Sequence, residues 1–310
     1  MISGKGAGET ARGKRNAFYN TLEELHKYFE RIDILSPVRA SLFGNVFFHP
    51  ELPESFDVMT VQEYFPFRNG RLAEKIWRKA HIPYLLEIHH VPGYPRAANF
   101  SEWVARLATR LYIASDAKYA AAVRVVNQIQ TPDFLRRAGV PQEKIKYIPS
   151  MYIDLDIFRP MHIEKKYDVL FVGRRATNKG IELFQETVRK LKTQTPNLKE
   201  LIVDGWAKDS NELAKIYNES RLLIVPSYNE GGPRVMLEAL ACSTPVLATR
   251  VGLAPELLPE DCLIDWSVDD IVRKARLVLS GAIPFPGVDL ARFEKTTAVR
   301  AYAECIQSIS

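Results

Sequence analysis

Two glutamates, Glu230 and Glu238, lie on either side of a sequence that is typical of the start of a helix. Pro233 suits a first helical position, because the N–H that proline lacks would have no partner there. Gly231 and Gly232 let the backbone approach a ligand closely, and their amides would point at it from the positive end of the helix. Two carboxylates near one such pocket suit a molecule with many hydroxyl groups that is joined to a phosphate.

A second segment, residues 171–180, runs from the end of an expected strand into an expected helix and carries cations. Gly173 permits a tight turn, while Arg174 and Lys179 would lie at the mouth of the sheet. Ligands of open α/β sheets bind there, outside the carboxyl ends of the strands. A forked guanidinium and an ammonium group together suit a diphosphate, whose charge grows as it leaves a substrate. Taken alone, the segment fits a solvated basic loop equally well.

The composition is that of a soluble globular protein, with 46% hydrophobic and 25% charged residues. A length of 310 residues allows two domains, each with its own core. No apolar run reaches the roughly 20 residues that cross a bilayer, and no apolar core follows the basic N-terminus, so a secretory signal is not expected. Cys242, Cys262 and Cys305 have no ligand spacing, which predicts reduced thiols in a cytoplasmic protein and no metal site.

The positive charge is concentrated in the first half of the chain. Residues 1–160 hold 22 lysines and arginines against 17 aspartates and glutamates, whereas residues 161–310 hold 20 of each. The excess fits an anionic acceptor or an anionic membrane surface, and it fits a solvated face equally well. The isoelectric point near 9.0 comes without an aromatic and basic recognition motif, so no nucleic acid is expected as a partner.

One helical pattern combines apolar and basic residues. Trp103, Leu107 and Leu111 recur at helical spacing beside Arg106 and Arg110. An interfacial helix would have this composition. A core-facing helix with a charged outer side is the favoured interpretation.

Apolar runs alternate with helical patterns along the chain, which predicts an α/β protein with parallel sheets covered by helices. A charged stretch without periodicity, residues 152–167, separates an N-terminal domain over 1–160 from a C-terminal domain over 161–290, and a last helix is expected within 291–310. The expected strands include 31–35, 84–88, 121–126, 169–172, 201–203, 222–225 and 245–248.

The start of the chain lacks a clear first strand, because Met1-Ile2 is too short to form one. The glycine-rich run 3–8 is similar to a loop near a ligand phosphate, but it does not have the Gly-x-Gly-x-x-Gly spacing of a dinucleotide site. A flexible terminus or a truncated start is favoured, so the first strand of the N-terminal domain is expected to be truncated.

In their types and their order along the chain, these motifs resemble those of glycosyltransferase family 4, whose members are retaining enzymes of the GT-B fold. The resemblance covers most of the chain and is strongest over 167–265. It rests on the glutamate pair, the Gly-Arg…Lys-Gly loop, Val203-Asp204-Gly205, the strand end at Pro226-Ser227, and the stretch from Thr244 through Gly252 to Glu256. The resemblance implies two Rossmann-like domains whose parallel sheets face each other across a cleft, with a terminal helix that returns to the first domain.

The resemblance also implies roles for the site residues. Arg174 and Lys179 would hold the donor diphosphate, and Glu238 would accept hydrogen bonds from ribose hydroxyls. Glu230 would fix the transferred sugar together with the amides of the glycine pair. The implied donor-binding set is Gly173, Arg174, Lys179, Gly231, Gly232 and Glu238.

Two histidines, His89 and His90, follow the expected strand 84–88, and the resemblance implies that one reaches across the cleft to the donor sugar. Alternation along a strand lets only one face the cleft readily, and His89 is the predicted one. A packing or surface histidine is the alternative. Glu230 and His89 are therefore the predicted catalytic residues. No carboxylate is placed as the nucleophile of a retaining hydrolase would be, and none of the carboxylate pairs resembles a divalent-metal motif.

The sequence thus predicts a metal-independent, retaining hexosyltransferase-type enzyme that uses a nucleotide-diphosphate sugar as co-substrate and needs no cofactor. The acceptor would be a glycan, a lipid or a small molecule. The expected location is the cytoplasm. Peripheral contact of the protein with an anionic membrane, at its inner face, is an alternative that the sequence does not decide. A non-catalytic relative that binds nucleotide sugars and a sugar-nucleotide epimerase of the same fold are the alternatives. Trp206 is expected to pack in the core rather than to contact the donor base.

Overall fold

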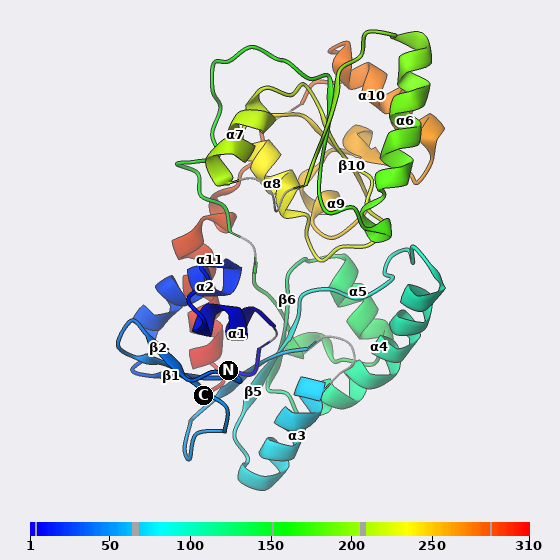
Figure 1. The fold of residues 1–310 in the computed structure, drawn as a ribbon. Helices are drawn as coiled ribbons and strands as arrows, with labels where there is room; N and C mark the ends of the chain where they lie inside the picture. The colour runs from blue at the N-terminus through cyan, green and yellow to red at the C-terminus, as the bar shows by residue number, and fades with distance from the viewer. Residues whose placement is uncertain (4, 64–67, 151, 205–208, 286) are drawn as a thin grey trace.

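Short apolar runs form the central strands of two parallel sheets, one in each lobe of the protein (Figure 1). The computed structural model describes residues 1–3, 5–63, 68–150, 152–204, 209–285 and 287–310. In the C-terminal lobe the strand order is β12-β11-β10-β8-β9, and all neighbours are parallel. The strands are β8 (Val169–Val172), β9 (Glu200–Val203), β10 (Leu223–Val225), β11 (Val246–Thr249) and β12 (Leu263–Ile264). Every residue of β8, β10 and β11 is buried, as expected for a sheet covered on both faces.

The N-terminal lobe combines a parallel sheet, in the order β4-β5-β6-β7, with a smaller mixed sheet, in the order β1-β3-β2. The parallel strands are β4 (Met59–Gln62), β5 (Tyr84–Ile88), β6 (Ala122–Val125) and β7 (Ile145–Tyr147). The mixed sheet holds β1 (Ile32–Leu35), β2 (Ala40–Leu42) and β3 (Val46–His49), with β2 antiparallel to β3. Parallel sheets in both lobes confirm the predicted α/β class.

The first residues of the chain join these two N-terminal sheets. Ile2 forms parallel bridges with Leu35 of β1 and with Val61 of β4. Its N–H donates to the carbonyl of Thr60 at 2.8 Å, and its own carbonyl accepts from the N–H of Gln62 at 2.9 Å. Two residues are thus enough to fill the position between β1 and β4.

The glycine-rich segment after Ile2 forms a helix, α1 (Lys5–Ala11), so the prediction of a loop or flexible terminus is wrong there. Asn16 holds this helix: its amide nitrogen donates to the carbonyl of Gly6 at 3.0 Å, and its amide oxygen accepts from the hydroxyl of Thr10 at 2.8 Å. Ala7 is buried in the core behind it. These contacts order a segment whose glycines suggested flexibility.

Helices cover the sheets, and some of them begin at a side-chain cap. Asn99 accepts a hydrogen bond from the N–H of Glu102 at the start of α4 (Phe100–Lys118), and Asp209 forms a capping box with Glu212 at the start of α7 (Ser210–Asn218). The helices of the N-terminal lobe are α2 (Ala17–Leu25), α3 (Arg68–Ala80), α4 (Phe100–Lys118) and α5 (Gln130–Arg137). Those of the C-terminal lobe are α6 (Ile181–Gln194), α7 (Ser210–Asn218), α8 (Arg234–Ala241), α9 (Ala254–Leu257) and α10 (Val268–Leu279).

The last helix, α11 (Lys295–Gln307), packs on the N-terminal lobe beside α2, as Figure 1 shows. Its residues Val299, Tyr302 and Ile306 share a buried cluster with Leu22 and Leu25 of α2. The end of the chain therefore contributes to the core that the start of the chain also builds. None of the helices in the described ranges is long and apolar enough to cross a membrane.

Candidate functional site

The loops at the carboxyl ends of β8 and β10 are held together at Gly180. Its backbone is left-handed, with a φ of +71°, and a Cβ there would lie 2.1 Å from the carbonyl oxygen of Pro226. Only glycine fits this position. The N–H of Tyr228 also donates to the carbonyl of Asn178 at 2.8 Å. The loop with Lys179 therefore lies against the loop with Glu230.

A cavity of about 390 Å³ lies where these two loops meet α8. It is at the carboxyl ends of parallel strands, where ligands of α/β sheets bind. Its lining brings together most of the predicted site residues, namely Gly173, Arg174, Lys179, Glu230, Gly232 and Glu238. Ser210, Leu213 and Arg234 also line it, and the sequence analysis did not select them.

Lys179 and Glu230 form an ion pair in this cavity, with 2.7 Å between Nζ and Oε2. The hydroxyl of Ser227 donates to the other carboxylate oxygen at 2.7 Å. The Lys179 side chain is 22% exposed and that of Glu230 is 10% exposed, so water screens the pair weakly. An anionic ligand in the cavity would compete with Glu230 for the ammonium group.

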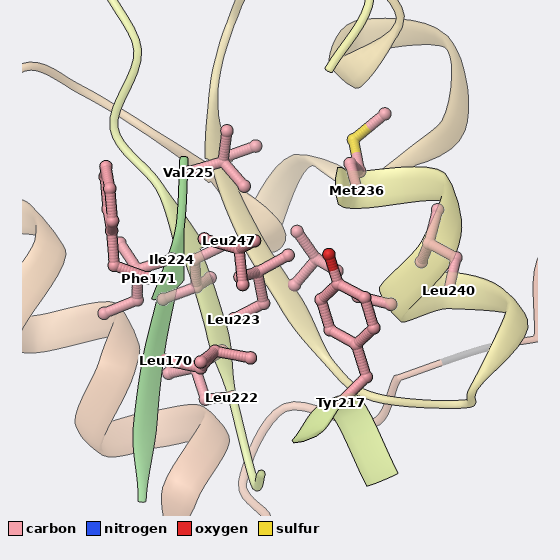
Figure 2. Packing of buried hydrophobic residues seen from close by; sticks show 14 of the residues in the cluster. Leu170, Phe171, Tyr217, Leu222, Leu223, Ile224, Val225, Met236, Leu240 and Leu247 are labelled. Carbon is pink, nitrogen blue, oxygen red and sulfur yellow. The ribbon is translucent and has the colours of Figure 1, made fainter. Parts of the chain in front are cut away.

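Glu238 lies on α8, is only 4% exposed, and has one partner on each carboxylate oxygen. The hydroxyl of Tyr217 donates to Oε2 at 2.8 Å, and Nε of Arg234 donates to Oε1 at 2.9 Å. Figure 2 shows Tyr217 among the buried apolar side chains beneath α8. Burial raises the pKa of Glu238, and Arg234 and Tyr217 act in the opposite direction. Because a carboxylate has about four acceptor sites, Glu238 keeps capacity for ligand hydroxyls.

The glycine pair before α8 is divided between two environments. Gly232 lines the cavity, whereas Gly231 lies at the contact between the lobes. A Cβ on Gly231 would lie 1.7 Å from the carbonyl oxygen of His89, and the Gly231 carbonyl accepts from the side-chain amide of Asn127 at 2.9 Å. Pro233 immediately precedes the first residue of α8, one position earlier than predicted.

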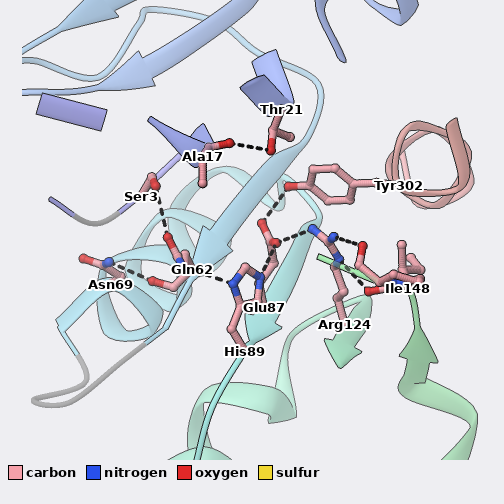
Figure 3. A network of polar contacts seen from close by, with 11 residues as sticks. Ser3, Ala17, Thr21, Gln62, Asn69, Glu87, His89, Arg124, Ile148 and Tyr302 are labelled. Atoms are coloured by element: carbon pink, nitrogen blue, oxygen red, sulfur yellow. Dashed lines mark hydrogen bonds and ion pairs between the residues drawn. The ribbon is translucent and has the colours of Figure 1, made fainter. Parts of the chain in front are cut away.

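The imidazole of His89 is held inside the N-terminal lobe (Figure 3). Nδ1 lies 3.2 Å from the amide nitrogen of Gln62, and Nε2 lies 3.1 Å from a carboxylate oxygen of Glu87. With the amide of Gln62 as donor, Nδ1 accepts and Nε2 carries the hydrogen that faces Glu87. The ring is thus fixed in orientation by its own lobe, and it is the backbone carbonyl of His89 that lies against Gly231.

Glu87 is the centre of a buried polar network that supports His89 (Figure 3). Arg124, its neighbour across β5 and β6, donates to Oε2 at 2.7 Å, and the hydroxyl of Tyr302 on α11 donates to Oε1 at 2.6 Å. Burial alone would raise the pKa of Glu87, but the Arg124 guanidinium, with His89 and Tyr302, lowers it to about 2. The network links β5, β6 and α11 directly behind the predicted catalytic histidine.

His90, not His89, has a side chain that contacts the opposite lobe. Its Nε2 lies 2.9 Å from the amide oxygen of Asn229, the residue before Glu230. The amide nitrogen of Asn229 donates to a carboxylate oxygen of Glu102 at 2.8 Å and to the carbonyl of Arg96 at 3.0 Å. Part of the His90 ring stays open to solvent, yet dehydration by its surroundings lowers its pKa. No sequence signal selects Asn229, and the sequence analysis missed it.

Two aromatic residues of the C-terminal lobe, Tyr228 and Trp266, contact the N-terminal lobe at Arg96. The guanidinium of Arg96 lies 5.2 Å from the ring centroid of Trp266 and 5.6 Å from that of Tyr228. The indole N–H of Trp266 donates to the carbonyl of Ser227 at 2.9 Å. The loop that carries Glu230 is therefore fastened both to its own lobe and to the N-terminal lobe.

Some predicted features lie outside this site. Gly205 and Trp206 are outside the described residues. Cys242 and Cys262 are buried and Cys305 is half-buried, and each is a free thiol. Within the described ranges, no group of three or more histidine, cysteine, aspartate or glutamate side chains is placed to hold a metal ion.

The architecture of two lobes is that of GT-B glycosyltransferases. Sucrose-phosphate synthase from Thermosynechococcus elongatus superposes with a TM-score of 0.67 at 17% identity, over 99% of this chain and 93% of that one. HepE from Anabaena, in complex with UDP-glucose, gives a TM-score of 0.60 at 14% identity, over 98% of this chain and 94% of that one. The predicted fold class is confirmed by these likenesses.

The comparisons of sequence bear out the family resemblance: the chain is similar to group 1 glycosyl transferases. The family model of Glycosyl transferases group 1 matches residues 196–280. A D-inositol 3-phosphate glycosyltransferase of Streptomyces bingchenggensis is 25% identical over 248 residues, which are 66% of this chain and 53% of that protein. An N,N'-diacetylbacillosaminyl-diphospho-undecaprenol alpha-1,3-N-acetylgalactosaminyltransferase of Campylobacter jejuni is 25% identical over 162 residues, 43% of each chain. The chain thus spans about half the length of these curated relatives.

Proposed function

We propose that the protein is a retaining glycosyltransferase that binds a nucleotide-diphosphate sugar in the cavity between β8 and α8. The observation that carries this proposal is the placement of Arg174 and Lys179 on the wall of one cavity with Glu230 and Glu238. Cations for a diphosphate and carboxylates for hydroxyl groups are the two requirements of such a donor. The UDP-glucose complex of HepE, which has the same fold, supports this class of ligand.

Donor binding would rearrange the ion pair in the cavity. The diphosphate attracts Lys179 and Arg174, so that Glu230 loses its ammonium partner and can accept hydrogen bonds from the sugar. Glu238, held by Tyr217 and Arg234, receives the ribose hydroxyls. The N-terminal end of α8 adds positive potential beside the leaving group.

The N-terminal lobe would supply the histidine and bind the acceptor. Gln62 and Glu87 orient His89, whose carbonyl already lies against Gly231 of the donor lobe. In a front-face reaction the departing diphosphate oxygen takes the proton of the acceptor, and the positive side chains stabilise the leaving group without a metal. The Campylobacter relative is named for a diphospho-undecaprenol acceptor, which supports a lipid-linked or phosphate-bearing acceptor here.

The test is a reaction of the purified protein with a panel of nucleotide sugars and acceptors, in the presence of a chelator. We expect one donor to release its nucleoside diphosphate only when an acceptor is present, and proton NMR to show the donor's anomeric configuration in the product. Inversion of that configuration would refute the retaining mechanism. A new nucleotide sugar formed without acceptor would identify an epimerase, and tight donor binding without any release across the panel would identify a non-catalytic relative.

A further inference from the structure

One face of α4 presents a continuous apolar stripe to solvent. Its members recur at intervals of about one helical turn, so they lie in one row along the helix. Phe100 is 77% exposed and Leu111 is 75% exposed. The stripe consists of Phe100, Trp103, Val104, Leu107 and Leu111, all exposed.

The core side of α4 is a different face of the helix. Thr109, Ile113 and Ala117 are buried there against the sheet of the N-terminal lobe. The predicted core-facing orientation of Trp103, Leu107 and Leu111 is therefore wrong. In Figure 1, α4 forms the outer edge of its lobe. Large apolar side chains gathered in one exposed row mark an interaction surface, whereas scattered ones do not.

Basic side chains border the stripe. Arg110 and Lys118 are exposed on α4 itself, and Arg110 donates to the carbonyl of Arg137 on α5 at 3.4 Å. On the other side, the guanidinium of Arg71 from α3 lies 4.4 Å from the ring centroid of Tyr112. Helices α3 and α4 thus both contribute positive charge to one surface.

The acidic residues near this surface are turned away or paired. On α4, Glu102 binds Asn229 of the opposite lobe, and Asp116 is buried. On α5, Asp133 is paired with Arg137 at 3.0 Å. The stripe is therefore bordered by an excess of positive charge.

We propose that α4 binds an anionic membrane surface, lying parallel to it with the stripe inserted among the lipid headgroups. An apolar row that includes phenylalanine and tryptophan and is flanked by arginine and lysine has the chemistry of an interfacial helix. The basic border adds attraction to anionic lipids. A second copy of the chain is a poorer occupant, because a two-fold contact through this face would bring the positively charged borders of two identical surfaces together.

The position of α4 relates this surface to the cleft. Glu102, in its first turn, binds Asn229 next to Glu230, so the N-terminal end of the helix lies at the edge of the cleft. A protein held on a membrane by α4 would keep the cleft close to acceptors in that membrane. This consequence rests on the proposed function, whereas the membrane binding itself does not.

The test is co-sedimentation of the full chain with vesicles. One set contains equal parts of phosphatidylglycerol and phosphatidylcholine, and the other contains phosphatidylcholine alone. We expect binding to the anionic vesicles that weakens as salt is added. The double variant Phe100→Ser/Leu111→Ser should bind at least about tenfold more weakly, because it removes two apolar side chains from the inserted row. Arg110→Glu should bind about tenfold more weakly, because it replaces attraction by repulsion.

Matched control variants test whether a loss of vesicle binding is specific to α4. Leu277→Ser on α10 removes an exposed apolar residue, and Arg189→Glu on α6 reverses an exposed charge, and both should bind like the wild type. Circular dichroism and the melting temperature establish that each variant is folded. Absence of wild-type binding to anionic vesicles would overturn the proposal, as would unchanged binding of the α4 variants. A dimer that Phe100→Ser/Leu111→Ser dissociates, without any vesicle binding, would assign the stripe to a second copy.

Discussion

The ammonium group of Lys179 lies 2.7 Å from the carboxylate of Glu230, so the residue predicted to hold the donor diphosphate is paired with the residue predicted to hold the sugar. The two side chains neutralise each other. A diphosphate offers Lys179 a stronger anionic partner, and its arrival would release Glu230 for the sugar. Under the proposed function, donor binding would therefore free the Glu230 carboxylate for the sugar.

The first prediction concerns Glu230. We expect Glu230→Gln to lower turnover by about 10²–10³-fold, because it removes charge from a group that acts in the transition state. The donor should bind no more weakly, since Glu230→Gln removes the carboxylate that competes with the diphosphate for Lys179. Steady-state kinetics and calorimetry measure the two effects separately. Glu186→Gln, an exposed change on α6, is the control, and a loss of affinity without a loss of turnover would contradict the assigned role.

The second prediction concerns Glu238. Glu238→Gln should weaken binding of the nucleoside diphosphate about fivefold, because a hydrogen bond to a charged acceptor is worth about 1 kcal/mol more than one to a neutral acceptor. Binding of inorganic pyrophosphate, which lacks the ribose, should be unaffected. Calorimetric titration with both ligands makes the comparison. If both ligands lose affinity equally, Glu238 does not contact the ribose.

The third prediction concerns the contact of the lobes at Gly231. An added Cβ would lie 1.7 Å from the carbonyl oxygen of His89, so the backbone at this contact must shift in Gly231→Ala, and we expect the two lobes to move apart. We expect kcat/KM to fall by about 10²-fold, since a displacement near 1 Å has such an effect. Small-angle scattering should show a larger radius of gyration. Gly287→Ala is the control, because a Cβ there meets no atom within 4 Å. Unaltered scattering and activity in Gly231→Ala would show that the lobes need not meet there.

The fourth prediction concerns pH and the buried network of Glu87. Its pKa is about 2 in the folded protein, below the ordinary value of 4.5. Between these values the unfolded chain binds a proton that the folded chain does not, so the free energy of unfolding should fall as the pH drops from about 4.5 toward about 2.

Denaturant unfolding of Glu87→Gln tests this. At neutral pH the variant should lose about 3–5 kcal/mol, because Arg124 is left buried without its carboxylate. Its free energy of unfolding should also depend less on pH in the acidic window. A wild-type slope in Glu87→Gln would assign the acid sensitivity to other groups.

The strands and the donor loops could be predicted because their causes are local. Continuous apolar runs specify β5 and β8, and the predicted strands at 84–88 and 169–172 have the same bounds in the structure. Glycines and cations at the ends of such runs indicate a site, and most of the predicted donor residues line one cavity. Arg234, four residues before Glu238 on one helix face, has a spacing that could have revealed it.

The missed features depend on contacts between distant parts of the chain. Tyr302 reaches Glu87 across 215 residues, and His90 reaches Asn229 across 139. Strand alternation predicted that one of the two histidines faces the opposite lobe, but it could not show that the imidazole that contacts that lobe is His90 and not His89. Helical periodicity in α4 showed which residues share a face. It could not show that Ile113 and its neighbours would fill the core instead of Leu111.

The most direct test of the donor site is thermal unfolding with a panel of nucleotides and nucleotide sugars, for the wild type, Lys179→Ala and Arg175→Ala. A ligand that binds only the folded state raises the melting temperature. Arg175 is the matched control, since it is exposed in the same loop and does not line the cavity. We expect one diphosphate nucleotide to stabilise the wild type and Arg175→Ala and to lose its effect in Lys179→Ala. Equal stabilisation of all three, or none by any nucleotide in a folded wild type, would contradict a donor site at Lys179.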